Sequence, residues 1–264
     1  MKPTINFLKL TRITLLFTIA LFVSCASKQD IVYFQDEMLA NSIENMNSDF
    51  ELKFKTDDLL TIDVSALDPE AAQPFNLPAV SYNTTNIIQA NGTLKMQTYL
   101  IDSKGNIEFP VLGTIKLGGL SRSDANAMLK ERLKEYIKDP IVNIRLANFT
   151  VTVLGEVNKP GTYTVMDEKI SVNEALGLAG DLTIYGKRDN VLLIREVDGE
   201  KRYAKFDLTS VNVVNSANYY LTQNDVIYVE PNNARVRQSA YNQNNGLIIS
   251  AVSTLATIVA ILIK

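Results

Sequence analysis

The sequence of 264 residues contains no histidine, no tryptophan and only one cysteine. Without histidine, the chain lacks the most common general base and the most common metal ligand in proteins. Ser-His-Asp and Cys-His nucleophiles and histidine-based zinc sites are therefore excluded. A single cysteine also excludes an intramolecular disulfide and a CxxC metal site. No catalytic, cofactor-binding or metal-ligating residues are predicted, and no cofactor is expected.

Glycine and proline are also scarce, with 12 and 8 residues, whereas 46% of the residues are hydrophobic. This composition is typical of a folded chain rather than a disordered one. At roughly 100–200 residues per domain, the length allows one or two domains.

The first 24 residues have the features of an export signal. Three basic residues precede an uncharged, apolar run over 13–23, which is too short to span a bilayer of about 30 Å as a helix. Ser24 and Cys25 follow directly, and this arrangement resembles the lipobox of bacterial lipoproteins. We therefore predict that 1–24 is a lipoprotein signal peptide and that Cys25 becomes the mature N-terminus, acylated with chains such as palmitate. The alternative is a buried core cysteine behind an ordinary signal peptide.

Removal of residues 1–24 would leave a net acidic chain. The whole sequence has 26 basic and 29 acidic residues, and the first 24 positions hold three basic residues and no acidic one. The mature chain would therefore have 23 basic and 29 acidic residues, a net charge of −6. An acidic chain without a basic stripe argues against a nucleic-acid partner, because that affinity depends on neutralising phosphates.

A second uncharged, apolar run covers 246–263 and is followed by Lys264. As a helix it would extend about 26 Å at 1.5 Å per residue, and we predict one C-terminal transmembrane helix here. Its polar side chains have a helical i, i+3, i+4, i+7 spacing, which places them on one stripe. The stripe consists of Ser250, Ser253, Thr254 and Thr257. These residues either pack against a neighbour in a simple anchoring helix or face a wet lumen in a ring of copies.

Between the two ends, the sequence predicts a mixed α+β organisation. Residues 25–49 are polar and read as a tether, and 233–245 reads as a linker. Two domains are expected, over 50–147 and 148–232.

In the first domain, alternating apolar residues predict strands on both sides of a turn at 56–58. A hairpin is predicted between 94–101 and 107–112. Ser121 is a good N-cap for the clearest helix of the chain, and 141–146 reads as a strand.

In the second domain, a strand over 151–157 is expected to form a hairpin with 162–165, through Pro160 and Gly161 in the order favoured for a type II turn. Ser171 and Glu174 form a capping box, and Gly180 supplies the left-handed position after a short helix. Four further strands are predicted, over 190–196, 201–206, 219–221 and 226–229. A hairpin, a crossing helix and further strands give a β-grasp-like order.

Two constellations invite a functional interpretation but have a simpler explanation. Asp57 and Asp58 could pair for catalysis or metal binding, yet without histidine or a second acidic cluster we favour a role in the turn. Tyr219 and Tyr220 could stack on sugar rings, but we favour sheet core with one exposed ring.

These blocks, in this order, resemble the bacterial outer-membrane polysaccharide export lipoproteins. In the first domain, the similar segments are Phe54–Val64 and Tyr99–Ser121, although Thr56 and Asp57 replace the more typical Pro-Gly. In the second domain, the similar segments are Gly155–Val157, Pro160–Tyr163 and Ala175–Gly180, with Asp181 where a second glycine is common. The resemblance covers about residues 50–232.

The resemblance implies a small α+β polysaccharide export domain, a β-grasp-like SLBB domain and one C-terminal membrane helix. It implies a lipid-anchored homo-oligomeric ring, mostly periplasmic, that serves as a passive outer-membrane conduit for capsular or extracellular polysaccharide. The implied partners are the polysaccharide chain, membrane lipid, copies of the chain itself and an inner-membrane co-polymerase or tyrosine kinase. In the best-known members, C-terminal helices form a barrel, which favours a lumen-facing stripe here. The alternative is a periplasmic lipoprotein that binds a sugar or peptidoglycan. An enzyme is not expected.

Overall fold

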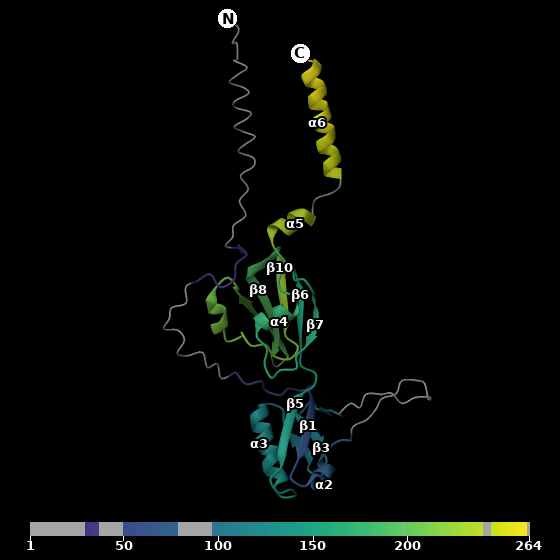
Figure 1. The fold of residues 1–264 in the computed structure, drawn as a ribbon, viewed down its shortest axis with the longest axis vertical. Coiled ribbons are helices and arrows are strands. Elements are labelled where there is room, and N and C mark those ends of the chain that lie inside the picture. The colour runs from purple at the N-terminus through teal and green to yellow at the C-terminus, as the bar shows by residue number, and fades with distance from the viewer. Residues whose placement is uncertain (1–29, 37–49, 79–96, 198, 240–243, 263–264) are drawn as a thin grey trace, which may run out of the picture.

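The computed structural model describes residues 30–36, 50–78, 97–197, 199–239 and 244–262. Figure 1 shows two domains that follow one another along the long axis, and two C-terminal helices beyond the second domain. Each domain has a separate hydrophobic core. We refer to residues 50–147 as the first domain and to residues 148–232 as the second domain.

The first domain contains two small sheets and one long helix. A three-stranded antiparallel sheet has the order β2-β1-β5, and β3 pairs with β4 in a separate hairpin. The strands are β1 (Leu59–Ser65), β2 (Tyr99–Leu100), β3 (Asn106–Phe109), β4 (Gly113–Lys116) and β5 (Ile141–Leu146), and the helical segments are α2 (Pro69–Ala72), η3 (Gln73–Phe75) and α3 (Arg122–Leu133). The core lies between the strands and α3, which buries Ala125, Leu129 and Leu133.

The predicted hairpin between 94–101 and 107–112 is wrong in its pairing. Among the described residues, β2 pairs with β1, and β3 pairs with β4. The turn between β3 and β4 contains Val111, and Gly113 begins β4; both residues have positive φ. The sequence prediction placed this turn inside a strand, because Val111 has high strand propensity and hides the reversal of the chain.

The second domain is built on one five-stranded sheet with the order β7-β6-β10-β8-β9. The strands are β6 (Thr150–Gly155), β7 (Gly161–Thr164), β8 (Gly186–Val197), β9 (Glu200–Phe206) and β10 (Val226–Pro231), and the helical segments are α4 (Val172–Leu178) and η4 (Val211–Asn215). The first and last strands, β6 and β10, are parallel neighbours in the middle of the sheet. This arrangement, with α4 contributing Val172, Ala175 and Leu176 to the core, matches the predicted β-grasp-like order.

Both predicted helix caps are confirmed. The Ser121 side chain accepts a hydrogen bond from the Asp124 amide at the start of α3. Ser171 and Glu174 form the full capping box of α4, and Gly180 has the expected positive φ of 73°.

Three local expectations in the second domain and after it are corrected. Gly161 has no positive φ and begins β7, so the turn before it lacks the left-handed glycine that a type II turn requires. The expected strand at 219–221 is reduced to a single bridge between Tyr220 and Ser171. The expected linker contains a helix, α5 (Asn233–Ser239).

The C-terminal run forms the helix α6 (Asn244–Leu262). Within the described segments, no helix is both long and apolar enough to cross a membrane. The predicted membrane span over 246–263 thus has no support from the structure.

Candidate functional site

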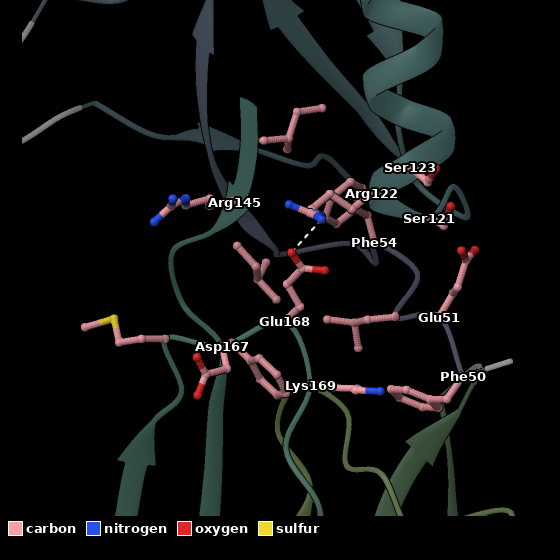
Figure 2. A pocket seen from close by; sticks show the side chains of 15 residues that line it. Phe50, Glu51, Phe54, Ser121, Arg122, Ser123, Arg145, Asp167, Glu168 and Lys169 are labelled. Carbon is pink, nitrogen blue, oxygen red and sulfur yellow. Dashed lines mark ion pairs between the residues drawn. The ribbon is translucent and has the colours of Figure 1, made fainter. Parts of the chain in front are cut away.

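A cleft of about 510 Å³ lies between the two domains (Figure 2). Its walls come from four segments: 50–54 before β1, 121–123 at the start of α3, 144–149 at the domain junction, and 166–169 between β7 and α4. The first domain contributes 50–54, 121–123 and 144–146, and the second contributes Phe149 and 166–169. Because both domains line the cleft, it exists only while they keep this arrangement.

One ion pair crosses the cleft. A terminal guanidinium nitrogen of Arg122 lies 2.5 Å from a carboxylate oxygen of Glu168, and Figure 2 shows the two side chains pointing toward one another. Arg122 is the first residue of α3, and Glu168 lies in the loop after β7. Their side chains are 42% and 66% exposed, so the pair contributes only about 0–1 kcal/mol to stability. Such a contact can open and close without a large change in free energy.

Aromatic contacts close one end of the cleft. The Phe50 ring stacks on Tyr220 with 5.4 Å between centroids, and the Lys169 ammonium lies 4.7 Å from the Tyr220 centroid. Tyr219 contacts Tyr220 edge to face at 5.3 Å and accepts a hydrogen bond from the Asn173 side chain. Both tyrosines are half-buried against protein groups, and neither lies in a strand. The packing role is therefore confirmed, but the expected sheet core with one exposed ring is corrected.

Asn148 clamps the junction between the domains. Its side-chain oxygen accepts from the Leu59 amide at 2.9 Å, and its side-chain nitrogen donates to the Asp57 carbonyl at 3.1 Å. On the other side, the Gln223 side chain donates to the Asn148 carbonyl and accepts from the Thr150 amide. The clamp therefore fixes the turn before β1 to the second domain. Nothing in the sequence pattern singled out Asn148 or Gln223 for this role.

The Asp57-Asp58 pair acts in this same turn, as the sequence predicts. Asp57 has a positive φ of 67°, and the Asp58 carboxylate accepts from the Lys55 amide at 2.7 Å. In the part of the chain that the structure describes, no three histidine, cysteine or acidic side chains gather as a metal site.

The cleft lining has the chemistry of a binding surface. Its charged side chains belong to three acidic and three basic residues, and they alternate with aromatic and aliphatic ones. The charged residues are Glu51, Asp167, Glu168, Arg122, Arg145 and Lys169. A surface of this kind can hold a polar ligand through hydrogen bonds and ring contacts.

None of the site residues predicted from the sequence is among the described residues that line the cleft. Cys25 lies outside the described residues. The hydroxyl stripe of Ser250, Ser253, Thr254 and Thr257 is on the exposed surface of α6. Three of these hydroxyls donate to the carbonyl four residues earlier, at 2.8 to 2.9 Å. The structure does not bring the stripe to the interdomain cleft.

Two family models match the two domains in order. The model described as polysaccharide biosynthesis/export protein matches residues 47–147, and the model of the SLBB domain matches residues 150–229. The chain thus carries a polysaccharide export domain followed by an SLBB domain, which supports the resemblance to polysaccharide export proteins.

Two curated relatives are similar to about two thirds of the chain. The chain is 27% identical over 179 residues to the EPS I polysaccharide export outer membrane protein EpsA of Ralstonia nicotianae, and 26% identical over 180 residues to the protein of that name from Ralstonia solanacearum. The matches cover 66% and 67% of this chain, but only 46% and 47% of the relatives. The chain thus spans about half the length of these relatives.

Proposed function

We propose that this chain is a component of a passive outer-membrane conduit that exports capsular or extracellular polysaccharide. The observation that carries the proposal is the order of the two domains: a polysaccharide export domain followed directly by an SLBB domain. The relatives are named as polysaccharide export proteins of the outer membrane, which supports the outer membrane as the location of this chain. No residue is assigned a chemical step, and the energy for transport comes from elsewhere.

The conduit is a homo-oligomeric ring anchored by acyl chains on Cys25, with most of the chain in the periplasm. Burial of each lipid CH₂ is worth about 0.8 kcal/mol, so several acyl chains give a firm anchor. The polymer is delivered by an inner-membrane co-polymerase or tyrosine kinase. These assignments extend the resemblance stated above to this chain.

In the ring, copies of α6 associate and turn the hydroxyl stripe toward the polymer. Two exposed sets of residues on α6 support this arrangement: the stripe itself, and large apolar residues that include Ile249, Val252 and Leu255, each about 60% exposed. These hydroxyls donate to backbone carbonyls and still have lone pairs that can accept hydrogen bonds. A wall of this kind forms weak hydrogen bonds with sugar hydroxyls, and a polymer can enter and leave it easily.

The stripe is tested by a matched pair of charge substitutions. Ser253→Asp should leave the oligomer and polysaccharide secretion intact, because a lumen-facing charge remains hydrated. Val252→Asp should abolish assembly, because it would place a charge in the apolar contact between neighbouring copies of α6. Equal effects of the two substitutions would contradict the lumen.

The second candidate is a lipoprotein that binds a sugar or peptidoglycan. The interdomain cleft of about 510 Å³, with its mixed polar and aromatic lining, favours this alternative. Native mass spectrometry of the detergent-extracted protein separates the two. A lipidated, closed oligomer supports the conduit, whereas a lipidated monomer supports the binding protein. Loss of secreted polysaccharide on deletion of the gene, restored by the wild-type chain, is the parallel test in cells.

A further inference from the structure

Residues 30–36, which we call the N-terminal strap, lie on the second domain although they were predicted to be a free tether. The amides of Phe34 and Gln35 donate to the carbonyls of Leu208 and Thr209, at 3.2 and 2.6 Å. Leu208 is fully buried and follows β9. The strap therefore runs along the loop that leaves the edge strand of the sheet.

Tyr33 is the side chain of the strap that reaches deepest. Its hydroxyl donates to the Asp181 carboxylate at 2.5 Å, and its ring lies 5.6 Å from the Arg188 guanidinium carbon. The ring also packs against the hydrophobic core of the second domain. Burial and the neighbouring Asp181 raise the pKa of the Tyr33 hydroxyl, so it remains a hydrogen-bond donor at physiological pH.

Arg188, which lies beside the Tyr33 ring, is a buried cation. Its residue is only 5% exposed, and it forms no ion pair with any described carboxylate. One terminal nitrogen donates to the carbonyls of Thr183 and Gly186, while its buried Nε has no partner in the described structure. A buried cation of this kind is stabilised by the face of an aromatic ring. The Arg188 carbonyl also accepts from the Leu208 amide. Arg188, which contacts Tyr33, is thus hydrogen-bonded to the same residue that binds the Phe34 amide.

We propose that Arg188 and Asp181 form a binding site for the phenol ring of Tyr33, and that this site fixes the N-terminal strap to the second domain of the same chain. One consequence rests on the proposed lipidation of Cys25. Only residues 26–29 separate Cys25 from the strap, a span of at most about 18 Å at 3.6 Å per residue. The acyl anchor therefore holds the second domain close to the lipid surface, whereas residues 37–49 separate the strap from the first domain.

Asp181 offers a substitution that removes the site, at the loss of one local hydrogen bond from the Leu182 amide. Its φ of +69° lies in the left-handed region that favours glycine, so Asp181→Gly removes the carboxylate and relieves backbone strain. Asp181→Asn keeps both the side-chain oxygen and the tolerance for this conformation. Asp139→Gly is the matched control, because Asp139 also has a positive φ, of 50°, but lies in the first domain after α3.

Hydrogen–deuterium exchange of the full-length protein in detergent tests the site. In the wild type, the Phe34 and Gln35 amides should exchange more slowly than in a free peptide. Tyr33→Ala and Asp181→Gly should speed their exchange about tenfold, whereas Asp181→Asn and Asp139→Gly should not. Free-peptide exchange in the wild type, or no effect of Asp181→Gly, would overturn the proposal. Protection that disappears on dilution would show that the strap binds a second copy instead.

The consequence for the anchor is tested by two insertions of the same flexible 12-residue Gly/Ser linker. Placed between Lys28 and Gln29, the linker lengthens the connection from lipid to second domain, and secretion should fall. Placed between Asn41 and Ser42, it leaves this connection unchanged, and secretion should persist. Equal secretion from both variants would overturn the spacing role. If deletion of the gene does not alter secretion, the proposed function fails, but the exchange measurements still decide the Tyr33 site.

Discussion

Among the described residues, each of the two domains buries one aspartate, and the two domains stabilise it in different ways. Asp225, fully buried before β10, accepts three contacts from the Arg195 guanidinium on β8, at 2.6 to 3.1 Å. Asp58, 2% exposed before β1, accepts from the Lys55 amide three residues earlier and forms no ion pair among the described residues. Burial raises the pKa of Asp58, with the Lys55 amide acting in the opposite direction. The second domain thus fixes its sheet by a long-range ion pair, and the first domain by a local turn.

The Arg195 network also explains how separate segments meet. The guanidinium donates to the Asn218 side chain and the Tyr220 carbonyl, and the Asp225 carboxylate accepts from the Thr222 amide. One ion pair therefore satisfies the polar groups of the irregular segment that connects η4 to β10. A buried pair of this kind adds little net stability over a hydrophobic one, but removal of one partner leaves a buried charge uncompensated.

The largest expected effect follows from breaking this pair. Asp225→Ala should lower the free energy of unfolding by about 3–5 kcal/mol, because Arg195, whose side chain is 13% exposed, loses its counter-charge. Urea unfolding measures the change. Glu230→Ala is the control, since the Lys187–Glu230 pair is more exposed and worth about 0–1 kcal/mol. A loss below 1 kcal/mol for Asp225→Ala would show that the pair does not organise the sheet.

The helix caps should respond alike in both domains. Ser171→Ala and Ser121→Ala each remove an oxygen that accepts from a first-turn amide, and each should cost about 1 kcal/mol. Glycine at either position should cost only a few tenths of a kcal/mol relative to serine. Thermal unfolding followed by circular dichroism is sufficient. A large difference between the two alanine variants would mean that tertiary contacts, rather than the cap, dominate one of them.

Tyr99→Phe should stabilise the first domain by about 1 kcal/mol. The buried Tyr99 hydroxyl has no hydrogen-bond partner in the described structure, and the ring would keep its stacking on Phe109. Burial raises the pKa of Tyr99 to about 12 from its ordinary value of 10.0. Because the folded state then holds a proton that the unfolded state releases, wild-type stability should fall between about pH 10 and 12. The variant should lack this pH dependence, which unfolding measured across this range would show. An equal slope in the two proteins would mean that burial does not raise the Tyr99 pKa, and a less stable variant would mean that the hydroxyl has a partner.

Asp58→Asn should have the smallest effect, within about 1 kcal/mol at neutral pH, because the amide oxygen can still accept from Lys55. The folded-state pKa of Asp58 is raised above 3.8. Its favourable contribution is therefore complete below pH 3.8 and is lost as the pH rises through the folded-state pKa. The variant should show a flatter dependence of stability on pH in this acidic range. A steeper loss of stability toward acid in the wild type would indicate that the carboxylate is stabilised as the anion.

The sequence by itself determined the features that depend on neighbouring residues. Caps at Ser121 and Ser171, the left-handed Gly180 and the resemblance to polysaccharide export proteins each follow from short patterns. The same reasoning failed at Val111, where a strand-forming residue occupies a turn, and it left Cys25 as a prediction outside the described residues.

Only the tertiary structure decided the contacts that join distant segments. Asn148 clamps the two domains, Arg195 pairs with Asp225 across 30 positions, and Tyr33 binds Asp181 across 148 positions. Each of these residues, taken alone, is an ordinary polar residue in the sequence, because hydrophobic periodicity reports which face is buried and not which partner lies opposite. Such pairings depend on how the whole chain closes, so only the folded structure brings the partners together.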